Sequence, residues 1–102
     1  MSAQTLIFIK NIVTIFVGRF FIMKIQRAVA LRTSNLLIKH NISQYELSKR
    51  MCTDQSTIKH IIHEEYKSIK FETVIKIADA FGMTIQEFLN DDLFKRENLD
   101  VD

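Results

Sequence analysis

The chain of 102 residues offers room for one domain with a modest core, which disfavours a two-domain enzyme. Hydrophobic residues make up 47% and charged residues 25%, a balance that excludes a disordered or fibrous chain. The net charge of +2 hides an asymmetry: residues 24–70 hold nine Lys/Arg against four Asp/Glu, whereas residues 71–102 hold three against eight. A basic region ahead of an acidic one is typical of a phosphate-binding surface.

Few residues that build turns are present. Proline is absent and the only glycines are Gly18 and Gly82, so long loops and β-hairpins lack their usual residues. This composition predicts an all-α protein. Cys52 is the only cysteine, so no internal disulfide can form, and a cytoplasmic bacterial setting is expected.

Residues 6–23, LIFIKNIVTIFVGRFFIM, form an apolar, β-branched run whose only charges are Lys10 and Arg19. Its length barely reaches that of a membrane span, and each interior cation costs roughly 2.5 to 3.5 kcal/mol there. A secretory signal would end in small residues, and Phe20 and Phe21 do not fit. Membrane insertion and secretion are therefore both disfavoured.

Three interpretations of this N-terminal extension, residues 1–23, stay open. It is an extra helix or strand that packs on the domain or a partner chain, a weak membrane association, or upstream sequence attached by an early start codon. We favour the last, because Met23 directly precedes the first residues with a domain-like pattern and the run shows no clear helical period.

From Lys24 the hydrophobic pattern becomes helical. It predicts a first helix that ends near residues 40–41, with an inward face of Ile25, Val29, Leu36 and Leu37. Ser43 then stands three residues before Glu46, a spacing typical of a capping box. A second helix is therefore expected over residues 44–51.

Asp54 suits the N-cap of a third helix over residues 55–63. Helical spacing places Ile58, Ile61 and Ile62 inside. The predicted outward face is polar and partly basic, and consists of Gln55, Ser56, Lys59, His60 and His63. Residues 64–70 are expected to form a loop.

A fourth helix and a fifth complete the pattern. The inward stripe of the fourth is Phe71, Val74, Ile75, Ala78 and Phe81, and Gly82 suits a left-handed helix end. Thr84 and Glu87 form a second capping box, which opens a fifth helix that contributes Ile85, Phe88 and Leu89. The domain is expected over residues 24–90, followed by an acidic tail over residues 91–102.

Two segments carry a resemblance to a known family: ISQYELSKRMCTDQSTIKHII and FETVIKIADAFGMTIQEFL. In this order they resemble the motif helices and the closing helices of the lambda-repressor-like (Cro/cI, or XRE) helix-turn-helix regulators, from about Ile25 to Leu89. The resemblance implies a five-helix, all-α DNA-binding domain in the cytoplasm. Cys52 stands where the family has glycine, so it must adopt a backbone angle that costs on the order of 1 kcal/mol.

The resemblance implies that the third helix lies in the major groove of double-stranded DNA. By position, the base-reading candidates are Gln55, Ser56, Lys59 and His60, and a Gln amide can bond bidentately to adenine. Candidates for phosphate contact are Gln44, Asp54, Thr57, His63, Lys67 and Lys70. The implied function is sequence-specific transcriptional regulation, most simply repression.

Members of this family usually bind as dimers. Candidates for a two-fold contact are Phe88, Leu89, Leu93 and Phe94, although Phe88 and Leu89 are equally well explained as core. A protein partner for the N-terminal extension is an alternative, in the manner of an antitoxin that neutralises a toxin and represses its own operon.

No enzyme, metal or cofactor is expected. His60, His63, Glu64 and Glu65 follow the order H-x-x-H-E rather than the H-E-x-x-H of zinc proteases. No nucleophile turn or phosphate-cradling glycine loop is present.

Overall fold

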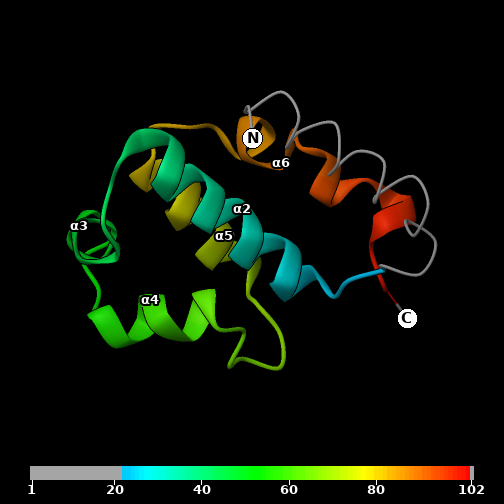
Figure 1. The fold of residues 1–102 in the computed structure, drawn as a ribbon, viewed down its shortest axis with the longest axis horizontal. Coiled ribbons are helices and arrows are strands. Elements are labelled where there is room, and N and C mark those ends of the chain that lie inside the picture. The colour runs from blue at the N-terminus through cyan, green and yellow to red at the C-terminus, as the bar shows by residue number, and fades with distance from the viewer. Residues whose placement is uncertain (1–21, 102) are drawn as a thin grey trace, which may run out of the picture.

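The computed structural model describes residues 22–101, and helices dominate that range (Figure 1). They are α2 (Ile25–His40), α3 (Gln44–Arg50), α4 (Gln55–Ile62), α5 (Phe71–Ala80) and α6 (Ile85–Leu89). The described part of the chain contains no strand, and the predicted all-α class with five helices is confirmed. The N-terminal extension lies outside the described residues, apart from Ile22 and Met23.

The helices pack around α2. Contacts join α2 to α4, α3 to α4 and α5 to α6, and Figure 1 shows α4 along the lower edge with α3 beside its first turn. The largest fully buried side chains are Val29, Thr33, Leu36, Leu47, Ile58, Ile77 and Phe88. The hydroxyl of Thr33 donates to the carbonyl of Val29 at 2.7 Å, so this buried polar group is satisfied.

In α2 and α5, three residues that were expected inside are exposed. Ile25 is 41% exposed because it lies in the first turn of α2, ahead of the core, which begins at Ala28. Phe71 is 61% exposed and Ile75 37% exposed. The buried residues of α5 are Val74, Ile77 and Ala78, whose directions are centred close to Val74, and Ile75 lies about 100° round the helix from that centre. The prediction of these three residues as core was wrong.

Backbone turns between helices use left-handed residues. Gly82 has φ +68° after α5, as predicted, and Asn41 has φ +53° after α2. Cys52 has φ +54°, so the strained angle expected at this glycine position is confirmed. Glu64 has φ +57° after α4.

Residues 91–101 fold back onto α2. Two 3₁₀ turns, Asp92–Phe94 and Arg96–Asn98, follow α6, and the ring of Phe94 lies 5.9 Å from that of Phe88. A parallel bridge joins Met23 to Leu99 through hydrogen bonds of 3.0 and 2.8 Å. The segment that was expected as an acidic tail is therefore attached to the domain at both its start and its end.

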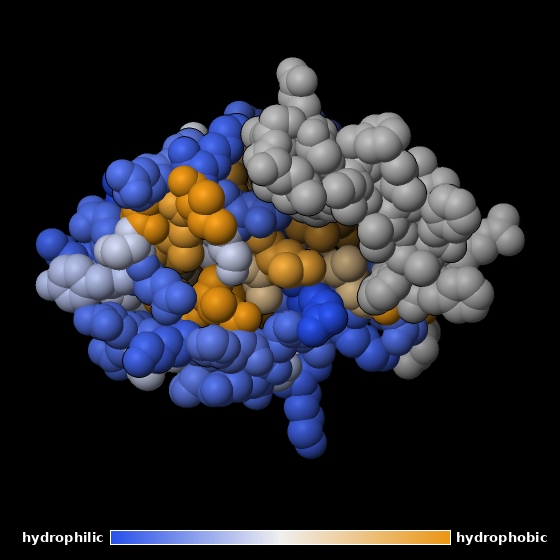
Figure 2. Space-filling model, viewed as in Figure 1, coloured by the Kyte–Doolittle hydropathy of each residue, from blue (hydrophilic) through white to orange (hydrophobic). Residues whose placement is uncertain are grey.

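No helix of residues 22–101 is long and apolar enough to cross a membrane. On the face that Figure 2 shows, hydrophobic residues gather over the central helices. Hydrophilic residues cover the lower edge, where Figure 1 places α4.

Candidate nucleic-acid interface

The start of α3 is fixed by Ser43. Its hydroxyl accepts a hydrogen bond from the amide of Glu46 at 3.0 Å. The carboxylate of Glu46 instead accepts from Arg50 at 3.4 Å, one turn further along the same helix. Only half of the predicted capping box is therefore present. Gln44, the first residue of α3, is half-buried.

One face of α4 is buried and the other is open to solvent. Ile58 and Ile61 pack in the core, so the spacing of the helix turns Gln55, Ser56, Lys59 and His63 outward. All four are exposed and Thr57 is half-buried. Four of the predicted DNA-contacting residues therefore share an open helix surface.

Asp54 occupies the N-cap position of α4, but its carboxylate accepts no capping hydrogen bond. The predicted cap was wrong in this respect. Because Asp54 is exposed, its carboxylate is already solvated by water, and the net gain from bonding an exposed amide is small. The first amides of α4 are thus left without a side-chain acceptor, at the positive end of the helix dipole.

His60 differs from its neighbours on α4 because it faces the following loop. Its Nε2 lies 3.1 Å from a carboxylate oxygen of Glu65, and its Nδ1 lies 3.4 Å from the hydroxyl of Tyr66. The rings of His60 and Tyr66 meet edge to face, with centroids 5.6 Å apart. Both ring nitrogens therefore already have partners in the protein, whereas the side-chain amide of Gln55 bonds to none of residues 22–101.

Most of the lysines without a carboxylate partner lie in one part of the sequence. In residues 22–101, ion pairs neutralise Lys24, Arg27, Arg32, Arg50, Lys76 and Lys95. Lysines in the same range without such a pair are Lys39, Lys49, Lys59, Lys67 and Lys70. Four of these belong to α3, α4 and the loop that follows, so this part of the sequence keeps four lysines that form no ion pair with a carboxylate of residues 22–101.

The loop of residues 63–70 is held by two residues that the sequence pattern did not predict as functional. The side chain of Gln26 donates to the carbonyl of Lys67 at 2.9 Å, and Arg27 pairs with Glu64 at 3.3 Å. No local pattern could have revealed these contacts, because 41 and 37 residues separate the partners.

The dimerisation candidates fall into different environments. Phe88 is fully buried within the chain, so its interpretation as core is correct and it is not available for a two-fold contact. Leu93 and Phe94 are half-buried, and Phe94 packs against the core. Leu89 is 36% exposed and is the most accessible of the four.

In residues 22–101 no group of three His, Cys, Asp or Glu side chains is placed to hold a metal ion. The contact of His60 with Glu65 is a pair only. The open face of α4 and the lysines without a carboxylate partner instead suit an anionic partner.

This arrangement defines a helix-turn-helix DNA-binding protein: a short helix, a tight turn and a second helix whose polar face is open. The family model of the Cro/C1-type HTH DNA-binding domain matches residues 32–92, more than half of the chain. The chain belongs to this family, and the resemblance seen in the sequence is confirmed. Neither the curated proteins nor the solved structures gave a significant match.

Proposed function

We propose that this protein is a transcriptional repressor that binds an operator as a homodimer, with α4 in the major groove. One observation carries the proposal: the open polar face of α4 includes Lys59 and is followed in the chain by Lys67 and Lys70, and none of these lysines forms an ion pair with a carboxylate of the described residues. A surface of this kind attracts phosphates and presents hydrogen-bonding groups to base edges.

Base reading is assigned to the first turn of α4. The exposed amide of Gln55 offers one donor and one acceptor, the pair that matches N7 and the amino group of adenine. Ser56 and Lys59 are exposed on the same helix surface and extend the contact along the groove. Such contacts provide the choice of sequence.

Phosphate contacts supply affinity without sequence preference. Gln44 at the start of α3 and the exposed side chains of Lys67 and Lys70 are assigned to this role. Each phosphate that a lysine neutralises adds about 0.9 to the slope of log affinity against log salt. The strength of binding should therefore fall steeply as salt is added.

One reading helix covers few base pairs, and two copies on half-sites about 34 to 36 Å apart would cover a full operator. Leu89, at the exposed end of α6, is the residue we assign to the two-fold contact. Repression then follows because the bound dimer occupies the DNA that RNA polymerase needs. The protein acts by binding and not by catalysis.

The test is a binding titration of the full chain on a duplex of its own upstream DNA and on a scrambled duplex, across a salt series. Gln55→Ala should weaken binding to the upstream duplex alone, by about 1 to 3 kcal/mol. Gln86→Ala, at an exposed glutamine of α6, is the matched control and should leave the affinity for both duplexes unchanged. Absence of salt-dependent binding on every duplex would overturn the proposal.

A further inference from the structure

The loop of residues 63–70, here called the basic loop, carries Lys67 and Lys70 but has no helix of its own. It leaves α4 through the left-handed residue Glu64, and the amide of Glu65 donates to the carbonyl of His60 at 2.9 Å. A lysine on an unrestrained loop loses entropy when it is fixed against a phosphate. The contacts that restrain this loop before DNA arrives therefore bear on affinity.

The basic loop is held from two sides. On the α4 side, Glu65 and Tyr66 contact the ring of His60. On the α2 side, Gln26 donates to the backbone carbonyl of Lys67 at 2.9 Å, and Arg27 donates to both carboxylate oxygens of Glu64 at 3.3 Å. The loop thus connects the reading helix to the first turn of α2.

Of these contacts, the one made by Gln26 acts on Lys67, a lysine that is assigned to phosphate contact. It fixes the backbone of Lys67, and hence the point from which the lysine side chain extends. Gln26 is itself half-buried, and the adjoining turn of α2 is anchored in the core by Ala28 and Val29. The donor is therefore mounted on a rigid element.

Gln26 precedes residue 32, where the match to the family model begins. The matched residues therefore include Lys67 but not its partner Gln26.

We infer that Gln26 is a positioning residue for DNA binding: it holds the basic loop so that Lys67 meets a backbone phosphate. The inference rests on the proposed function. The role assigned to Gln26 passes through Lys67, whose backbone carbonyl it bonds.

The experiment is a double-mutant cycle on the full chain with a duplex of its upstream DNA and a scrambled duplex. Gln26→Met keeps the size of the side chain but removes the donor, and Gln26→Ala serves as a second variant. Loss of one hydrogen bond of this kind should weaken binding about three- to ten-fold on both duplexes. The salt slope should fall toward that of Lys67→Ala, which loses about 0.9.

In the Lys67→Ala background, Gln26→Met should have no further effect on affinity or slope. Asn35→Ala, at an exposed site of the same helix, is the control and should match the parent chain. Additive losses from Gln26→Met and Lys67→Ala, or an unchanged affinity of Gln26→Met, would overturn the inference. If the parent chain itself shows no salt-dependent binding, the proposed function fails instead.

Discussion

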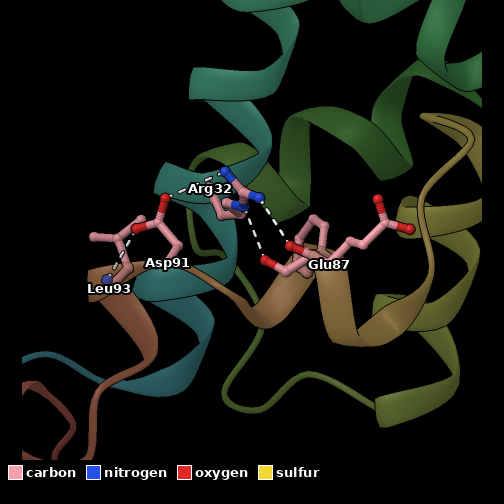
Figure 3. A network of polar contacts seen from close by, with 5 residues as sticks. Arg32, Glu87, Asp91 and Leu93 are labelled. Atoms are coloured by element: carbon pink, nitrogen blue, oxygen red, sulfur yellow. Dashed lines mark hydrogen bonds and ion pairs between the residues drawn. The ribbon is translucent and has the colours of Figure 1, made fainter.

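The guanidinium of Arg32 lies 3.2 Å from the carboxylate of Asp91, across 59 residues of sequence (Figure 3). The same group donates to the last carbonyls of α6, to Phe88 at 2.8 Å and to Glu87 at 3.1 Å. The other carboxylate oxygen of Asp91 accepts from the amide of Leu93 at 3.0 Å. One side chain of α2 therefore closes the end of α6 and orients the segment beyond it.

Arg32→Met should lower the free energy of unfolding by about 2 kcal/mol, because it removes the hydrogen bonds of a mostly buried guanidinium to the carbonyls of Phe88 and Glu87 and its ion pair with Asp91. Urea unfolding followed by circular dichroism measures this loss. Lys76→Met removes an exposed ion pair on α5 and should cost less than about 0.5 kcal/mol. Equal losses in the two variants would contradict the role given to Arg32.

Cys52→Gly should stabilise the fold by about 1 kcal/mol, because Cys52 is exposed and has φ +54°. Cys52→Ala keeps the strained angle and should leave the stability nearly unchanged. The difference between the midpoints of urea unfolding reports the strain directly. A lower midpoint for Cys52→Gly than for Cys52→Ala would show that no strain is stored at this turn.

Substitutions at Leu89 and Phe94 should separate effects on self-association from effects on folding stability. Phe94→Ala removes a half-buried ring from the core and should cost about 2 kcal/mol of unfolding free energy. Leu89→Glu should leave the unfolding of the monomer nearly unchanged and weaken self-association, as measured by sedimentation equilibrium. A Leu89→Glu chain that associates like the parent would exclude this end of α6 as the two-fold contact.

His60→Ala should weaken binding by a similar factor on upstream and scrambled duplexes, because its ring nitrogens bond Glu65 and Tyr66 within the protein. Anisotropy titrations against a set of single-base variants of the operator provide the measurement. Gln55→Ala, in contrast, should lose its preference at one base pair. A His60→Ala protein with altered preference at one base pair would identify His60 as a base reader.

Local signals predicted most of the fold. The Thr84–Glu87 capping box is complete, with hydrogen bonds of 3.1 Å in both directions. The left-handed angle of Cys52 was predicted because the family has glycine at this position. These features depend on residues a few positions apart, and for that reason the sequence displays them.

Contacts between distant segments could not be predicted in the same way. Gln26 meets Lys67, and Arg32 meets Asp91, only because of the angles at which α2 packs against the rest of the chain. The direction of His60 depends on where the basic loop passes. Ile75 was wrongly predicted to lie on the buried face of α5, because the apolar residues of this helix are compatible with more than one choice of buried face.

The bridge between Met23 and Leu99 closes the described chain into a ring. Its two backbone hydrogen bonds and the 2.8 Å ion pair of Lys24 with Asp100 join the two ends of the domain. A stretching force applied between these ends loads this junction before it reaches any helix. Under tension the contacts of Met23 and Lys24 with residues 98–100 should therefore break first, while α4 stays folded.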